Sequence, residues 1–248
     1  MPGEAVASEP AVPILGYYGK VPTHGDFIRR RLPRSFLDPW DRWLQRAMAS
    51  SRERLAEAWL DRYLTAPIWR FALSPEVCGD RLAAGVLMPS VDSVGRYYPM
   101  SIAVVQPLPG NLFALAARGQ DWFARAEETA LYCLENGFLP AAFEERLDAL
   151  GAPPGGLCAP AAPAASPALD SARGLGWRIE VNALSHLSTE VYPGLLDEVL
   201  GARFAPYSLW WTAGSSEISP RLLVYGGLPP ADDFSWFLAG DGADDDSE

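Results

Sequence analysis

Three strand-like segments follow one another closely between residues 66 and 107, and this succession limits the folds that are open to the chain. The segment Ala66–Leu73 alternates between two sets of side chains, and the segments Ala84–Val91 and Arg96–Pro107 are largely apolar. Residues Asp92–Gly95 have the composition of a hairpin turn, with a glycine available for a positive φ. Because connections this short join antiparallel strands, the sequence predicts an antiparallel meander.

A buried strand at about Pro13–Gly19 is expected beside this meander, followed by a long helix. Asp38 is the predicted N-cap of that helix and Pro39 its first residue, where the missing N–H costs nothing. Ser50, with a glutamate three residues later, is typical of a capping box and predicts a break in the helix. The apolar stripe that should face the sheet consists of Trp40, Trp43, Leu44 and Ala47.

The second half of the chain should complete the same sheet, because its elements are too few for an independent domain. Residues 151–169 are mostly alanine and proline, which predicts a linker or a long surface loop. The predicted elements are helices at Gln120–Gly137, Pro140–Leu150 and Thr189–Leu200, strands at Gly176–Leu184, Tyr207–Gly214 and Arg221–Pro229, and a helical turn near residues 231–238. We therefore expect one domain over residues 13–239, between a flexible N-terminus (1–12) and a disordered acidic tail (240–248).

The charge balance argues against a nucleic-acid-binding protein. The chain of 248 residues has 31 acidic and 20 basic residues, a formal net charge of −11. Five of the acidic residues lie in the tail, but acidic residues still predominate without them. Such a surface repels a phosphate backbone. The 49% hydrophobic content instead predicts a folded protein with a substantial core.

The sequence carries no pattern of a cofactor, metal or disulfide site. Its three cysteines are an odd number without a CxxC pair, and His24 and His186 are the only histidines. Phosphate-binding loops, dinucleotide fingerprints, GxSxG elbows and HExxH helices are absent from it. We therefore expect neither a cofactor nor a metal.

The sequence also predicts a cytoplasmic protein. The N-terminus lacks the basic segment and apolar run of a signal peptide. The most apolar stretch, Ile102–Ala117, is interrupted by Pro107 and Pro109, which argues against insertion into a membrane.

Two loops carry the candidate functional residues. Lys20, His24 and Asp26 follow the first strand, in a loop that leads to an arginine cluster beginning at Arg29. Asp92 and Arg96 flank the predicted hairpin turn and form a second candidate group. These residues can form a surface that binds a partner, or they can only cap and close their own turns. From the residues alone both interpretations stay open.

Two further candidates have equally open alternatives. Trp210 and Trp211 point to opposite faces of any strand, so one can be an exposed anchor for a partner, or both can pack against a covered sheet. His24 and Asp26 could form a catalytic triad with a serine such as Ser90, which would make the protein a small hydrolase. A solvated or hydrogen-bonded histidine is the simpler interpretation.

Five segments, in the same order, resemble the TagF family of proteins associated with bacterial type VI secretion systems. They are GYYGKVPTHGDFIRRRLP, DPWDRWLQ, WLDRYLTAPIWRFAL, GVLMPSVDSVGRYYPMS and SLWWT. The resemblance is dense over Gly16–Gln106 and reappears at Ser208–Thr212. It implies an α/β fold, a three-layer α/β/α sandwich, for which the strand patterns predict a mixed, largely antiparallel sheet.

The resemblance further implies a non-enzymatic, post-translational repressor of type VI secretion that acts in the cytoplasm. The implied partner is the forkhead-associated scaffold protein Fha, and a PppA-like phosphatase, which is fused to some family members, would act here in trans. Our hypothesis is that the eight candidate residues form the surface that binds a secretion component. A structural adaptor, whose acidic tail and proline-rich loop recruit other factors, remains an alternative beside the hydrolase.

Overall fold

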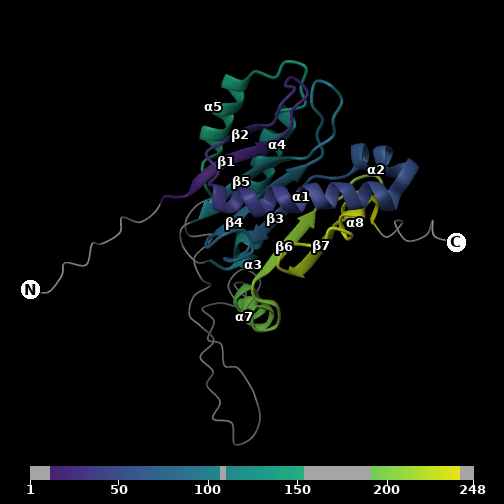
Figure 1. Cartoon of the computed structure of the whole chain (residues 1–248). Coiled ribbons are helices and arrows are strands. Elements are labelled where there is room, and N and C mark those ends of the chain that lie inside the picture. The colour runs from purple at the N-terminus through teal and green to yellow at the C-terminus, as the bar shows by residue number, and fades with distance from the viewer. Residues whose placement is uncertain (1–11, 107–109, 154–190, 241–248) are drawn as a thin grey trace, which may run out of the picture.

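A seven-stranded antiparallel sheet organises the molecule. The computed structural model describes residues 12–106, 110–153 and 191–240. The strand order is β2-β1-β5-β4-β3-β6-β7 (Figure 1). The strands are β1 (Ile14–Gly19), β2 (Ile28–Arg30), β3 (Trp69–Leu73), β4 (Leu82–Met88), β5 (Met100–Gln106), β6 (Tyr207–Thr212) and β7 (Arg221–Gly226). The predicted meander of β3, β4 and β5 beside β1 is confirmed. The predicted largely antiparallel sheet is confirmed, and among the described residues every strand pairing is antiparallel, with no parallel pair.

Helices accompany this sheet to give the predicted α/β fold. They are α1 (Arg34–Leu55), α2 (Trp59–Thr65), α3 (Leu112–Arg118), α4 (Gln120–Tyr132), α5 (Pro140–Leu150), α7 (Tyr192–Phe204) and α8 (Phe234–Ala239). Helix α1 is the longest of them and crosses the sheet (Figure 1). In the described part of the chain, no helix is long and apolar enough to cross a membrane.

Two apolar cores form because successive side chains of a strand point to opposite faces of the sheet. In β5, Ile102 and Val104 belong to one core, whereas Ala103 and Val105 belong to the other. The first core contains buried residues of α3, α4 and α5. The second core contains buried residues of α1, α2 and α8. Residues 69–106 thus supply side chains to both cores.

Helix α1 starts five residues earlier than the sequence predicts. It begins at Arg34, so Asp38 is not its N-cap and Pro39 lies inside the helix, where it removes one backbone hydrogen bond. Burial of Phe36 and Leu37 next to Trp40 offsets that loss, because these side chains enter the second core only if the helix extends past the proline.

The predicted break at Ser50 is also wrong. Helix α1 continues to Leu55, and a short 3₁₀ turn at Ala56–Ala58 connects it to α2. The Ser50 hydroxyl does not cap a helix but donates a hydrogen bond to Asp232, at 2.6 Å. The predicted apolar stripe is confirmed, since all four of its side chains are buried in the second core.

Helix α4 ends at Tyr132 and not at the expected C-cap, Gly137. The chain turns after Tyr132 so that Phe138 packs against its ring, with centroids 5.7 Å apart. Leu131, which is still within the helix but off its buried face, and Leu134, in the turn, are exposed. Strand β2 and helix α3 were not predicted. Helix α5 occupies the predicted residues.

The last elements complete the sheet, as expected. Strand β6 pairs with β3, and β7 pairs with β6. Helix α7 covers the second part of the predicted helix and extends to Phe204. The expected strand at Gly176–Leu184 lies outside the described residues, as do most of the predicted loop and the two terminal segments.

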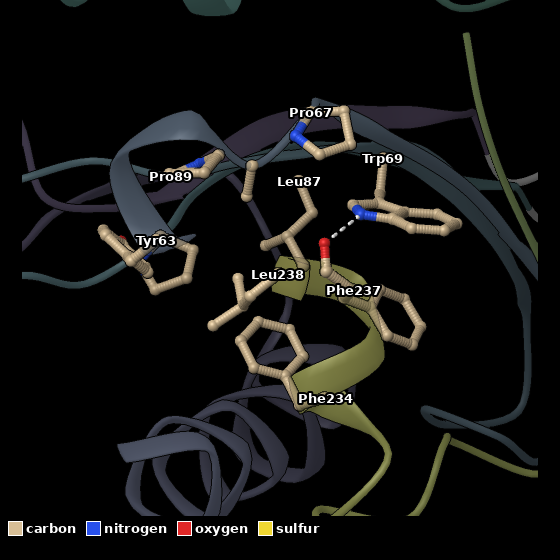
Figure 2. A pocket seen from close by; sticks show the side chains of 10 residues that line it. Tyr63, Pro67, Trp69, Leu87, Pro89, Phe234, Phe237 and Leu238 are labelled. Carbon is tan, nitrogen blue, oxygen red and sulfur yellow. Dashed lines mark hydrogen bonds between the residues drawn. The ribbon is translucent and has the colours of Figure 1, made fainter. Parts of the chain in front are cut away.

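Helix α8 closes the second core at its outer edge. Its Phe234, Phe237 and Leu238 face Trp69 and Leu87 of the sheet, and the indole N–H of Trp69 donates to the carbonyl oxygen of Phe237 at 3.0 Å (Figure 2). The apolar crevice between them has space for no more than about one water molecule. This packing fixes the point from which the C-terminal tail leaves the domain.

Candidate functional site

The two loops with candidate residues lie side by side because β1 and β5 are antiparallel neighbours. Strand β1 ends at Gly19 where β5 begins, so the loop of residues 20–27 meets the hairpin of residues 89–99. We call these two segments the loop pair. The hairpin turn contains Gly95 at a φ of 83°, as the sequence predicted.

Asp92 is the centre of the loop pair. One of its carboxylate oxygens accepts hydrogen bonds from the backbone N–H groups of Val94 and Arg96, at 3.0 and 2.8 Å. The other accepts from the Lys20 ammonium and from Nε of Arg96, the latter at 2.6 Å. Lys20, Asp92 and Arg96, the Asp92 cluster, are therefore brought together as three of the eight predicted residues.

The Asp92 carboxylate is ionised in the folded protein. Burial by itself would raise its pKa, but the hydrogen bonds from Lys20, from the backbone and side chain of Arg96 and from Val94 outweigh burial and hold the pKa well below its ordinary value. Lys20 is also buried, and its ammonium lies over the ring of Phe27, 4.8 Å from the centroid. Lys20 is thus part of the framework of the site and not a free surface charge.

The Asp92 cluster joins the two loops. The guanidinium of Arg96 donates to the carbonyl oxygen of Gly25 in the opposite loop. The backbone N–H of Ser93 donates to the carbonyl oxygen of His24, at 3.1 Å. The hydroxyl of Ser90 donates to the carbonyl oxygen of Lys20, at 2.7 Å. These bonds connect residues about 70 positions apart and make the loop pair one unit.

A second group of polar contacts fastens the loop pair to α1. The phenol groups of Tyr18 and Tyr98 both donate to the same carboxylate oxygen of Asp41, at 2.5 and 2.6 Å. Burial and these bonds raise the pKa of both tyrosines, so both are neutral. Phe27 stacks on Tyr18 and meets the edge of Tyr98. Sequence reasoning missed this group, although the paired tyrosines in GYYG and RYYP were a signal for it.

The outer surface of the loop pair carries a small mixed patch. Val94 at the tip of the hairpin is 68% exposed, and Phe27 is 44% exposed. Asp26 and Arg29 are exposed, and the outer face of the Arg96 side chain is accessible to solvent. His24 is half-buried, with its ring 6.1 Å from that of Phe138. This patch is apolar at its tips and charged around them.

The two tryptophans lie away from the loop pair, Trp210 within the second core and Trp211 partly buried against the first. Trp210 is fully buried on the side of α1 and stacks with Trp40, at 5.8 Å between centroids. Trp211 faces the other core, where its ring meets Phe123 edge to face. Of the two alternatives, the structure takes the one in which both rings pack against a covered sheet. The exposed anchor is therefore not found at Trp210.

Two of the three groups required for the alternative triad, Ser90 and His24, have other partners, and Asp26 is exposed. The Ser90 hydroxyl is buried and bonded to the carbonyl oxygen of Lys20. The Nδ1 atom of His24 is 2.9 Å from the hydroxyl oxygen of Thr23. Burial raises the pKa of the thiols of Cys78 and Cys133 to about 12, so both are protonated and poor nucleophiles at neutral pH.

Comparison with known proteins agrees with this architecture. A family model described as the TagF N-terminal domain, type VI secretion system-associated, matches residues 16–150, which include the whole loop pair. A solved structure, that of PA0076 from Pseudomonas aeruginosa PAO1, is 38% identical in sequence and has a TM-score of 0.75, and the match covers 92% of this chain and 95% of that one. A comparison with curated proteins found no match. Because the family model matches more than half of the chain, the protein belongs to the TagF family of type VI secretion system-associated proteins.

Proposed function

We propose that this protein is a non-enzymatic, post-translational repressor of bacterial type VI secretion. In this proposal it acts in the cytoplasm by binding a component of the secretion system, and the forkhead-associated protein Fha is the first candidate. A PppA-like phosphatase, if one takes part, acts in trans. Membership of the TagF family supports the connection with type VI secretion.

The observation that carries the binding proposal is the construction of the loop pair. Its charged groups are mostly used within the protein, since Lys20 and Arg96 hold the two loops together through Asp92. Such bonds fix the positions of the exposed Val94 and Asp26 before any partner arrives. A surface that is already ordered loses less conformational entropy on binding. The loop pair is therefore well suited to bind a protein.

The Ser90 hydroxyl and the thiols of the described cysteines give the hydrolase little support. Ser90 donates its proton to a backbone carbonyl, and both described cysteines have thiols with a raised pKa. A nucleophile needs a partner that accepts its proton, and Ser90 donates to the backbone instead. We therefore favour the regulator.

The proposal is tested with a double substitution at exposed positions of the loop pair. Asp26→Ala with Val94→Ser removes a charge and an apolar tip without touching the Asp92 cluster. Wild type and variant are used as bait in lysate of a strain with an active type VI system, and bound Fha is identified by mass spectrometry. The variant is expected to recover at least ten times less Fha, with a melting temperature unchanged within about 1 °C.

A matched control has the same two kinds of change far from the loop pair, Glu198→Ala with Leu222→Ser. Both side chains are exposed, on α7 and β7. This control should bind Fha like the wild type and, when overproduced, should still reduce the release of a type VI substrate into the medium. Equal recovery of Fha by wild type and loop-pair variant would rule out the loop pair as the binding surface. If wild type represses secretion without recovering Fha, another component is the partner.

A further inference from the structure

A groove with a basic wall runs along the outer side of α1. It is lined by Pro39, Arg42, Trp43 and Arg46 of the helix and by residues Leu228–Ala231, which precede α8. Its floor is apolar and rigid, because the indole N–H of Trp43 donates to the carbonyl oxygen of Pro229 at 2.8 Å. Arg42 and Arg46 are exposed along one wall.

In the part of the chain that the structure describes, no salt bridge engages the two arginines of this wall. Arg42 and Arg46 are four residues apart, so they lie on the same face of α1 and repel each other. Nε of Arg42 donates to the backbone carbonyl oxygen of Asp38, at 3.1 Å. Within residues 12–106, 110–153 and 191–240, neither arginine forms a salt bridge with an acidic side chain. The groove therefore favours an acidic occupant.

The same chain supplies an acidic segment within reach. Residues 241–248 follow α8 and include five acidic residues and no basic one. Phe234, at the start of α8, meets the ring of Trp43 with centroids 5.8 Å apart, so the groove lies at the far end of this six-residue helix. The helix is about 9 Å long, whereas eight extended residues span up to about 26 to 29 Å. The tail can therefore turn back along α8 and enter the groove.

We propose that the acidic C-terminal tail docks within its own chain in the groove of α1, with its carboxylates facing Arg42 and Arg46. A tethered segment has an effective local concentration in the millimolar range, so that even weak electrostatic contacts give substantial occupancy. The docked tail would compete with acidic segments of other proteins for this groove. The inference is independent of the proposed role of the loop pair, which lies elsewhere on the molecule.

The test compares the full chain with a chain that ends at Gly240, by ¹H–¹⁵N NMR. Removal of the tail is expected to shift the Nε–H resonance of Arg46, the indole resonance of Trp43 and the amide resonance of Ala231. Raising the NaCl concentration from about 50 mM to about 500 mM should move the same resonances of the full chain toward their positions in the truncated chain, because salt screens exposed charges.

Reversing the charges of Arg42 and Arg46 tests whether these two side chains hold the tail. In an Arg42→Glu/Arg46→Glu variant, truncation should no longer shift Trp43 or Ala231. Arg125→Glu is the matched control, since Arg125 is exposed on α4 and faces away from α1, and it should retain the full response. Shifts that are limited to residues 236–240 and to Arg221, which lies next to Gly240, would overturn the proposal. Shifts that grow with protein concentration would also overturn it, in favour of the tail of a second copy.

Discussion

At the scale of single residues, Asp92 shows how a surface-loop sequence becomes a buried electrostatic site. Read alone, the DSVG turn needs an aspartate only to cap its own backbone. In the structure, Asp92 also accepts hydrogen bonds from Lys20 and Arg96 and thereby links two loops. Removing a buried charge partner leaves the opposite charges without compensation. Asp92 and Lys20, which are buried, should consequently be determinants of stability and not directly exposed contacts.

The stability contributed by Asp92 should depend on pH. The folded-state pKa of Asp92 lies below the ordinary value of 3.8, so the contribution is fully present above that value and is lost as the pH falls toward the folded-state pKa. Asp92→Asn should therefore melt at a lower temperature than wild type at about pH 7, and the difference should shrink below about pH 4. Thermal unfolding, followed by circular dichroism between about pH 3 and pH 7, measures this difference in melting temperature. Asp26→Asn, at an exposed position, serves as the control. If the difference in melting temperature between wild type and Asp92→Asn does not change with pH, Asp92 is not the ionised, hydrogen-bonded group that the structure indicates.

At the scale of elements, α8 is short but its apolar side chains hold the edge of the second core. Phe237 is fully buried against Trp69 and Trp210, with ring centroids 4.5 and 5.3 Å away. A six-residue helix has little stability of its own in water. Tertiary packing of these side chains therefore keeps α8 in place, and with it the start of the acidic tail.

Truncation of one side chain tests this role of α8. Phe237→Ala should lower the free energy of unfolding by about 3 to 5 kcal/mol, because it leaves a cavity between α8 and the sheet. Chemical denaturation of the variant, compared with wild type, gives the difference. Leu222→Ala, on the half-exposed strand β7, should cost less than about 1 kcal/mol. A similar small loss for Phe237→Ala would mean that the core closes without α8.

At the scale of the whole molecule, the region matched by the family model does not contain the complete sheet. The match ends at residue 150, whereas β6 pairs with β3 through residues 207–212. Trp210 of β6 is fully buried and contacts Trp40, Trp43 and Phe71. Without β6, these rings and the edge of β3 would be exposed to water. The residues beyond the matched region are therefore needed to close the second core.

A chain limited to residues 12–150 should for this reason fail to form a stable monomer. Exposed apolar surface and an unpaired strand edge promote aggregation. Size-exclusion chromatography and near-ultraviolet circular dichroism should show aggregates and a loss of fixed aromatic packing, while residues 12–240 should behave like the full chain. A monomeric, cooperatively unfolding product from residues 12–150 would show that the first five strands fold alone.

The amino-acid sequence by itself predicts the meander, the apolar stripe of α1 and helix α5. Each depends on the spacing of apolar side chains and on turn residues, and these patterns are complete within a stretch of about ten residues. The tertiary structure decided the start of α1 at Arg34, the burial of Trp210 and the bonds of Arg96 and Lys20 with Asp92. These features depend on side chains that are distant in the chain and compete for the same buried space. A pattern within a short stretch of sequence contains no information about that competition.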